Sequence, residues 1–403
     1  MNKDLLHTPE GVRDLYNEEC AMKLWVQEKI HQVLHTYGYR DIQTPTFEFF
    51  DIFNKDRGSV ASKNMYKFFD REGNTLVLRP DMTPSIARMA SKYYMEEDMP
   101  VRLCYQGNTF INNSELQGKL KEMTIMGVEC IGDDTSDADA EIVAMVADAL
   151  SKAGLEEFQI EVGHVDFLEG LMEEAMLDED TKEELLSYIS SKNYFGVEEL
   201  IESKPMNEGV KNIFMKLPEL FGSREIINKA KNMTDNERAL NGLDRLEKLY
   251  SILEVYGLEK HIGIDLSMVS SYKYYTGIIL RAYTYGTGDA IVNGGRYNHL
   301  MEQFGKKAPS VGFGIHLDQL LVAMRRQNLT VDFKYENSMI LYEKNQKKAA
   351  IELAANHRGD GESIVLVRKS SRKSIAEYKE YAKRNKISSI YYIDGDAQLK
   401  IIF

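Results

Sequence analysis

The sequence predicts an α+β fold in which an antiparallel sheet is flanked by helices. Apolar, β-rich runs occur on both sides of a charged helical stretch at 166–258. After a polar stretch, the final residues alternate between helical and extended patterns. We therefore expect a sheet-containing core at 1–165 and 259–330, a helical insertion at 166–258 and a small C-terminal α/β module at 338–403.

The first elements follow from periodicity and from two special residues. A helix is predicted at about 18–34, where apolar residues recur at helical spacing. Gly38 suits a left-handed cap just past the end of that helix. The segment 41–50 has an extended pattern interrupted by Pro45, and proline removes a ladder donor. We expect that segment to form an edge strand or an interface strand.

Two hairpins and two helices are predicted next. The stretch 65–80 carries two β-rich runs around a polar turn, which is typical of a hairpin. A helix should follow at 83–94. A second hairpin is indicated by apolar runs at 101–110 and 122–131, and a helix with one apolar face at 136–152.

The later part of the core combines strands and one helix. Strand patterns return at 261–266 and 274–285, and we expect them to share a sheet with the strands before the insertion. Gly294 and Gly295 are expected in a tight turn where the backbone approaches a neighbour closely. An amphipathic helix is predicted at 317–327.

The C-terminal module is predicted to alternate helix and strand. After a polar stretch at 328–337 that suits a linker, the expected order is a helix, a strand, a helix and a strand. Their expected bounds are 346–356, 363–367, 373–384 and 389–393.

Composition restricts the classes of function. The 403 residues are 43% hydrophobic and 28% charged, the ordinary composition of a globular protein. The net charge of −13 argues against a surface devoted to nucleic acid, because phosphate binding needs clustered Lys and Arg. No run of about 18 apolar residues occurs, and the first residues lack a signal-peptide pattern. We expect a cytoplasmic protein without a membrane segment.

Cysteine and histidine give no metal-binding pattern at this stage. Cys20, Cys104 and Cys130 are too scattered for a disulfide framework or a zinc site, so we expect buried free thiols and no metal or cofactor. His164 and His316 are lone histidines in apolar surroundings, and we expect them to be core or turn residues.

Five polar or amphipathic residues stand inside otherwise apolar, strand-rich segments. Taken one at a time, each is equally well explained as a buried polar group satisfied by the backbone. They are Asp81, Thr83, Glu129, Tyr274 and Tyr275.

Read together, several segments resemble the histidyl-tRNA synthetase family over about residues 7–327. In order, they are LVLRPDMTPSIAR, YQGNTF with GVECIG, YYTGI, GGRYNHLMEQFG and PSVGFGI. GYRDIQTP with Pro45 resembles the dimer-interface motif 1 of that family, 101–132 its motif 2 and 308–320 its motif 3. The resemblance implies a class II aminoacyl-tRNA synthetase-like sheet and a homodimer.

The residues that would activate an amino acid are absent from the positions that the resemblance assigns to them. Activation needs cations aimed at the triphosphate, and one such contact is typically worth about 10²–10³ in rate. The three family arginines correspond to Ile111, Ser270 and Gln319, and Asn113 replaces an acidic residue that pairs with ATP. We therefore expect no synthetase chemistry and no catalytic residue in this chain.

Most residues of the amino-acid pocket implied by the resemblance are retained, in contrast to the residues for activation. Thr83, Glu129, Tyr274 and Tyr275 match the family, and Asp81 stands where it has a glutamate. These carboxylates would bind an α-ammonium group or an imidazole N–H. Two positions depart from the family pattern: a glutamine is replaced by Ile125, and an acidic residue by Lys273. Histidine binding is therefore a hypothesis.

Among relatives of that synthetase, the chain resembles the regulatory subunits of ATP phosphoribosyltransferase, which keep the body and lose this chemistry. The resemblance implies assembly with the short-form catalytic subunit as a homodimer within a hetero-octamer. It also implies that this chain is required for full activity of that subunit and for feedback by histidine in the first step of histidine biosynthesis. The C-terminal module would be an anticodon-domain-like remnant.

Two other interpretations remain open at this stage. An active histidyl-tRNA synthetase with displaced cations would exchange pyrophosphate in the presence of ATP and histidine. A histidine-binding module with another partner would bind histidine without any effect on phosphoribosyl transfer.

Overall fold

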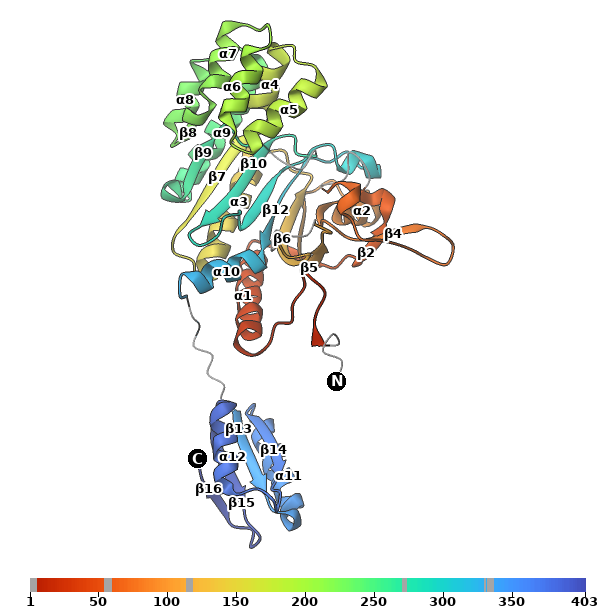
Figure 1. Cartoon of the computed structure of the whole chain (residues 1–403), viewed down its shortest axis with the longest axis vertical. Helices are drawn as coiled ribbons and strands as arrows, with labels where there is room; N and C mark the ends of the chain where they lie inside the picture. The colour runs from red at the N-terminus through yellow and green to blue at the C-terminus, as the bar shows by residue number, and fades with distance from the viewer. Residues whose placement is uncertain (1–5, 54–59, 114–118, 270–273, 330, 332–336) are drawn as a thin grey trace. The chain divides into compact units, whose positions relative to one another are not determined.

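A computed structural model of the chain describes residues 6–53, 60–113, 119–269, 274–329, 331 and 337–403 (Figure 1). They form two compact units, Met1–Thr330 and Val331–Phe403. Each unit has its own apolar core, and each is described by itself below.

The first unit is built on a nine-stranded sheet within the described part of the chain. Strands from before and after the helical stretch 166–258 share this sheet, as predicted. In spatial order they are β1 (Arg40–Ile42), β5 (Val101–Phe110), β6 (Glu122–Ile131), β12 (Ser310–His316), β11 (Val292–Arg296), β10 (Ile278–Thr284), β7 (Phe158–His164), β9 (Ile262–Asp265) and β8 (Phe221–Gly222).

Most neighbouring strands of the sheet are antiparallel, as predicted, but two pairs are parallel. β1 pairs with β5 in parallel, and β7 pairs with β9 in parallel. The second exception has a simple reason. The chain leaves β7, passes through the helices and returns to lie beside it as β9, and such a crossover produces a parallel pair.

Helices cover both faces of the sheet. Apolar residues of α1 (Asn17–Thr36), α3 (Ser136–Lys152) and α10 (Leu317–Arg326) belong to one core cluster, and those of α2 (Thr83–Tyr93) belong to another. Figure 1 shows α2 on the opposite side of β5 and β6 from α3. The predicted helices and the two predicted hairpins of this region are confirmed.

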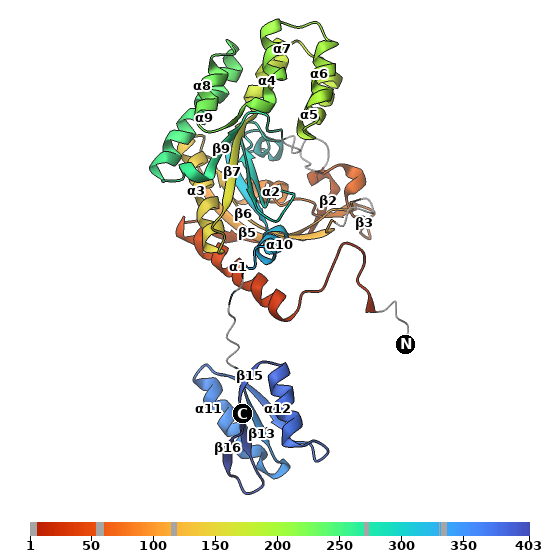
Figure 2. The same ribbon diagram turned by 60° about the vertical axis from the view of Figure 1, so that its left-hand side comes forward.

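The stretch predicted as a helical insertion is mostly helical, and its helices gather at one end of the sheet (Figure 2). It also contributes the short strand β8 to the sheet, which was not predicted. His164 caps the first helix of this stretch, because its buried imidazole Nδ1 accepts a hydrogen bond from the backbone N–H of Asp166. Phe167 and Leu246 pack in the same cluster as the sheet, so the division at 166 and 258 stays a prediction. The helices are α4 (Val165–Glu174), α5 (Glu179–Ser190), α6 (Tyr194–Glu202), α7 (Glu208–Met215), α8 (Glu225–Lys231) and α9 (Glu237–Val255).

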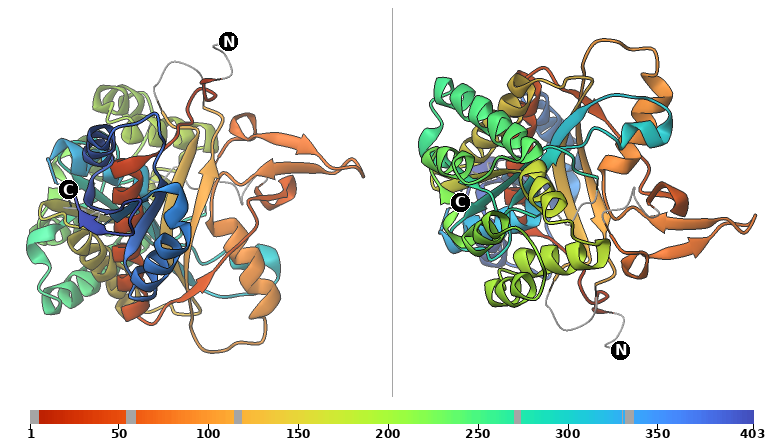
Figure 3. Two further views of the ribbon diagram at one scale, coloured as in Figure 1. Left: turned by 90° about the horizontal axis from the view of Figure 1, so that it is seen from below. Right: turned by 90° about the horizontal axis from the view of Figure 1, so that it is seen from above.

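The segment 41–50 is not one strand. β1 lies at the edge of the large sheet, whereas β2 (Phe47–Phe49) joins a separate sheet with β4 (Thr75–Leu78) and β3 (Lys67–Phe69). Pro45 lies between them, and the guanidinium of Arg79 donates to its carbonyl at 3.1 Å. The hairpin of β3 and β4 extends away from the rest of the unit (Figure 3). Gly38 has φ of +80°, as expected for the cap of α1.

The second unit is a four-stranded sheet with two helices. The predicted alternation is confirmed, but two strands were missed: β13, which begins where a linker was expected, and β16, which is short and exposed. Most of the expected linker lies outside the described residues. The elements are β13 (Asn337–Tyr342), α11 (Lys347–Gly359), β14 (Ser363–Arg368), α12 (Ile375–Arg384), β15 (Ile387–Ile393) and β16 (Leu399–Ile401).

Short 3-10 turns complete the elements: η2 (Phe50–Phe53), η4 (Ser62–Asn64), η5 (Leu217–Glu219), η6 (Glu259–His261), η7 (Met301–Phe304) and η8 (Lys344–Gln346). All three cysteines are free thiols; Cys104 and Cys130 are buried as expected, whereas Cys20 is only half-buried, because it lies in the first turn of α1. Among the described residues, we find no helix with the length and apolar character needed to cross a membrane.

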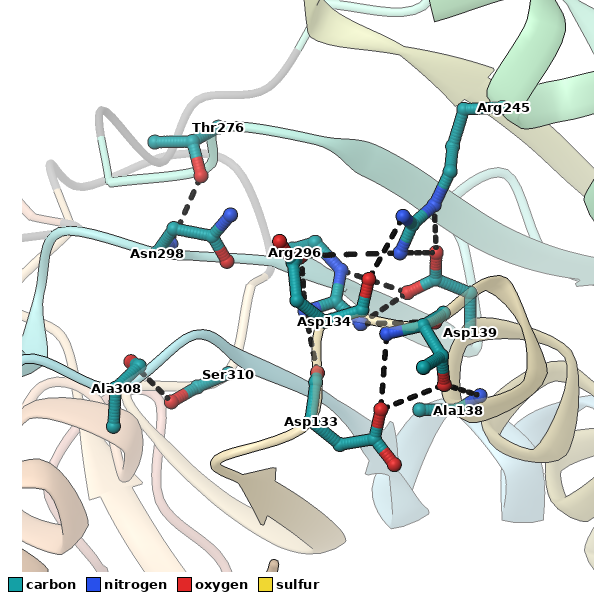
Figure 4. Close-up of polar contacts among 11 residues, drawn as sticks. Asp133, Asp134, Ala138, Asp139, Arg245, Thr276, Arg296, Asn298, Ala308 and Ser310 are labelled. Atoms are coloured by element: carbon teal, nitrogen blue, oxygen red, sulfur yellow. Dashed lines mark hydrogen bonds and ion pairs between the residues drawn. The ribbon is translucent and has the colours of Figure 1, made fainter.

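A buried ion cluster joins three elements of the first unit (Figure 4). Asp139 on α3 is fully buried, and its carboxylate faces two guanidinium groups. Arg296 on β11 approaches one oxygen at 2.7 Å, and Arg245 on α9 approaches the other at 2.7 Å. Backbone carbonyls of Asp133 and Asp134 accept further bonds from these arginines. The cluster therefore ties the helical stretch to α3 and to the sheet.

Asp139→Asn should strongly destabilise the first unit. The substitution removes the buried counter-charge of the Arg296 guanidinium and leaves it beside the largely exposed Asp134. Breaking a buried pair in this way costs about 3–5 kcal/mol. Asp134→Asn is the matched control, because Asp134 contacts the same two arginines with a largely exposed side chain. It should cost less than about 1 kcal/mol. Equal losses in denaturant unfolding of the two variants would contradict this assignment.

Candidate functional site

A cavity lies on the face of the sheet that α2 covers, and strand alternation decides which residues reach it. On β6, Met126 and Val128 point into the core shared with α3, whereas Ile125 and Glu129 point to the cavity. On β12, the small residues Gly312 and Gly314 line the cavity. Small residues on this face leave room beside a buried carboxylate.

The structure brings all five predicted pocket residues together around this cavity. Asp81 and Thr83 come from the start of α2, Glu129 from β6, and Tyr274 and Tyr275 from just before β10. The other lining residues are Met82, Tyr105, Ile125, Asn293, Tyr297, Gly312, Phe313, Gly314 and His316.

Glu129 is the buried acid at the centre of the site, with 1% of its surface exposed. The hydroxyl of Thr83 donates to one carboxylate oxygen at 2.8 Å, and the hydroxyl of Tyr297 donates to the other at 2.5 Å. Burial raises the pKa of Glu129 to about 8; the two hydroxyl donors oppose this rise, and the nearby Asp81 adds to it. At neutral pH the closed cavity therefore favours the protonated acid.

Asp81 supplies the second carboxylate. Its Oδ2 accepts a hydrogen bond from the Tyr274 hydroxyl at 3.0 Å, and its Oδ1 accepts one from the backbone N–H of Thr83 at 3.3 Å. The ring of Tyr274 packs edge-on against Tyr275 at 5.0 Å and Tyr297 at 5.8 Å between centroids. The site thus combines two carboxylates with an aromatic wall.

The charged side chains among the described residues that line the cavity are acids. None of the described residues that line it is Lys or Arg, while two are acids. A ligand that brings an ammonium or imidazolium group places a positive charge beside Glu129, and an opposite charge nearby favours the ionised carboxylate. Such a ligand would displace the proton that Glu129 holds in the closed cavity.

Sequence reasoning missed Tyr297 and Asn293, which lie on the cavity face at β11. Asn293 and Tyr297 are four residues apart, an even spacing that places two side chains on one face of a strand, but the segment was interpreted as a turn. His316 is half-buried at the end of β12 and also lines the cavity, where its Nε2 lies 2.9 Å from the side-chain nitrogen of Asn293.

Gly294 and Gly295 lie in strand β11, so the predicted turn was wrong, although the predicted close approach is present. A Cβ at Gly295 would lie 2.6 Å from the carbonyl of Ile278. Gly312 is more restricted still, because a Cβ there would lie 1.9 Å from Oε2 of Glu129. These glycines are explained by the packing of neighbouring strands and of the buried acid.

The cavity is nearly closed in this structure. Its volume is about 30 Å³, room for two or three water molecules at roughly 10–15 Å³ each. An amino acid is much larger than that. Entry of such a ligand therefore requires the walls of the cavity to move apart.

A second, larger cavity of about 420 Å³ adjoins the first and shares Asn293 and His316 with it. Ile111, Asn113 and Gln319, where the resemblance placed the lost charges, all line this second cavity. Ser270 and Lys273 lie outside the described residues.

The charges around the second cavity balance one another. Sequence reasoning missed two cations there, Lys119 and Arg281, but two acids, Asp289 and Asp318, line it as well. The guanidinium of Arg281 already donates to the carbonyl of Val269 at 2.5 Å. A triphosphate needs an excess of cations aimed at its oxygens, and the described residues of this cavity do not provide one.

Comparison with known proteins identifies the family. Residues 11–320 match the family described as histidyl-tRNA synthetase. The ATP phosphoribosyltransferase regulatory subunit of Acetivibrio thermocellus is 38% identical over 359 residues, covering 89% of this chain and 86% of that protein. This chain belongs to the ATP phosphoribosyltransferase regulatory subunit family.

The structural neighbours agree with this membership. A crystal structure from Bacillus halodurans C, titled an ATP phosphoribosyltransferase regulatory subunit/histidyl-tRNA synthetase, has a TM-score of 0.87 at 32% identity. The similarity covers 97% of the chain described here and 99% of the Bacillus halodurans chain. A histidyl-tRNA synthetase from Nostoc, at 17% identity and a TM-score of 0.80, shares the fold. The predicted synthetase-like fold is thus confirmed.

Glu129→Gln should change how stability depends on pH. The folded state holds the Glu129 proton up to about pH 8, whereas the unfolded chain releases it near the ordinary pKa of 4.5. Between these values the folded state binds more protons, so this group's contribution to the free energy of unfolding falls as pH rises. Gln cannot titrate, so the variant should lose less stability than the wild type between pH 5 and pH 8.

Denaturant unfolding at pH 5, 6.5 and 8 measures this difference. Glu122→Gln on the same strand is the control, because Glu122 is only half-buried and accepts a bond from Asn108 outside the cavity. Parallel pH profiles for the wild type and Glu129→Gln would show that the acid is ionised in the folded protein.

Proposed function

We propose that the chain is a non-catalytic regulatory subunit that assembles in the cytoplasm with the short-form catalytic subunit of ATP phosphoribosyltransferase. It raises that subunit to full activity and makes the first step of histidine biosynthesis sensitive to histidine. Histidine binds in the cavity around Glu129 and acts as an effector. The assembly is a homodimer of this chain within a hetero-octamer, with the Pro45 segment at the dimer interface.

One observation carries this proposal: the two adjoining cavities differ in what they retain. The cavity around Glu129 has the two carboxylates and the tyrosine pair that suit an amino acid. In the cavity lined by Ile111 and Gln319, the described residues provide no excess of cations for a triphosphate. A pocket that binds histidine without activating it can report the histidine concentration.

The closed state of the first cavity supplies a physical basis for regulation. A ligand that requires the walls to separate binds one arrangement of the chain better than another, and that difference shifts the population of the assembled complex. A coupling of only about 1–3 kcal/mol is typical of such control.

The direct test is the rate of phosphoribosyl transfer by the short-form catalytic subunit from the same organism. Adding this chain should raise the rate, and histidine should suppress the rate of the mixture. No change in rate would overturn the proposal. Histidine-dependent exchange of pyrophosphate into ATP by this chain alone would instead favour an active histidyl-tRNA synthetase.

Thr83→Val should weaken inhibition by histidine without removing activation. The change deletes the hydroxyl that donates to Glu129, and loss of one such bond in a buried site costs about 1–3 kcal/mol. Thr109→Val is the control, since Thr109 is fully buried outside the cavity and its hydroxyl has no partner in the described part of the chain. Equal inhibition of complexes with either variant would place the histidine effect elsewhere.

Histidine binding should release protons near pH 7. Glu129 holds a proton in the closed cavity, and a cationic ligand favours its ionised form. Calorimetry in buffers of different ionisation enthalpy should show release of up to about one proton per histidine. The release should disappear in Glu129→Gln. Proton uptake, or no exchange in the wild type, would contradict the assigned role of this acid.

A further inference from the structure

Three side chains with metal-ligating atoms converge on the surface of the first unit, away from both cavities. His31 and His35 stand one turn apart near the end of α1, and Asp41 lies on β1. The Nε2 atom of His31 is 2.7 Å from one oxygen of Asp41, and Nε2 of His35 is 2.7 Å from the other. One ligand atom from each residue lies within 4.8 Å of the others.

We propose that His31, His35 and Asp41 form a binding site for a divalent ion of the zinc class. Two imidazole nitrogens and a carboxylate oxygen are a ligand set that zinc accepts, with a solvent molecule in the fourth position. Bonds of about 2.0–2.2 Å in a tetrahedron place ligand atoms roughly 3.3–3.5 Å apart. The two nitrogen–oxygen separations of 2.7 Å would have to lengthen by roughly 0.6–0.8 Å to reach that spacing.

The fold prearranges this site. His31 and His35 occupy positions i and i+4 of a helix, which places them on one face; their rings are 4.1 Å apart between centroids. The turn at Gly38 reverses the chain so that Asp41 returns beside that face. The buried thiol of Cys104 donates a hydrogen bond to Asp41 Oδ1 at 3.4 Å, which helps to fix the orientation of the carboxylate.

The exposure of the three side chains suits an ion with an open coordination position. Their side chains are 42%, 46% and 55% exposed for His31, His35 and Asp41, so solvent and a metal ion can reach them. The sequence alone predicted no metal site, because the three cysteines are scattered and only the lone histidines His164 and His316 were considered beside them. The helical histidine pair was the overlooked signal, and only the fold adds the carboxylate.

A bound ion would join the end of α1 to β1, the edge strand of the large sheet. The inference does not depend on histidine binding, because its residues differ from those that line the two cavities. Asp41 does lie in the segment with Pro45 that the proposed function assigns to the dimer interface. It predicts one ion per chain, bound by groups of that same chain.

Competition between the full chain, freed of metal by a chelator, and a chromophoric zinc chelator tests the site. One Zn²⁺ should bind per chain. His31→Gln and His35→Gln should each weaken binding by at least about 10-fold, since even losing a partner of a metal ligand typically costs about 10–100-fold. Circular dichroism of each variant checks that the chain remains folded.

His357→Gln is the matched control, because His357 pairs with Glu362 at 2.8 Å as a single histidine and carboxylate. It should leave zinc affinity unchanged. Asp41→Asn provides a second probe, since it keeps the shape of the side chain and removes its charge; it should also weaken binding. Equal affinity of the wild type and the histidine variants, or one ion per two chains, would overturn the proposal.

Discussion

The carboxylate of Asp139 is the constraint on which the arrangement of the first unit depends. It is fully buried on α3, and it neutralises one arginine from the sheet and one from the helical stretch. A buried guanidinium without a counter-charge is costly, so these three elements have to meet at one point. Arg296 precedes Tyr297, and successive residues alternate between faces. The residue that anchors the sheet to α3 is therefore adjacent to one that holds the acid of the cavity.

That adjacency gives the cavity a physical connection to the rest of the unit. Opening the closed cavity has to displace groups such as Tyr297, whose hydroxyl donates to Glu129. Tyr297 cannot move far without straining Arg296, which is held by Asp139 and by backbone carbonyls. A ligand that opens the cavity therefore acts on a strand already bonded to α3, and through Arg245 the same cluster reaches α9. Movement at the cavity can thus bear on the helical stretch.

In the proposed function, the two adjoining cavities keep the binding of an amino acid and lose the chemistry of its activation. Activation of an amino acid depends on charges aimed at a transition state, so replacing a few arginines is sufficient to abolish it. Binding an amino acid depends instead on buried carboxylates and shape, which the strands and their glycines maintain. Gly312 shows the strength of that requirement, since any side chain there would collide with Glu129. The packing that positions the acid also preserves the fold.

Local patterns in the sequence were sufficient for most elements, because helix period, hairpin turns and the Gly38 cap depend on neighbouring residues. Ordered motifs also placed the five pocket residues in one site. Tertiary structure alone decided the parallel pairing of β7 with β9, the division of 41–50 between two sheets and the strand at Gly294, since each depends on distant partners. It alone placed Tyr297 beside Glu129 and Asp41 beside His31, because hydrogen-bond partners far apart in sequence leave no local signal.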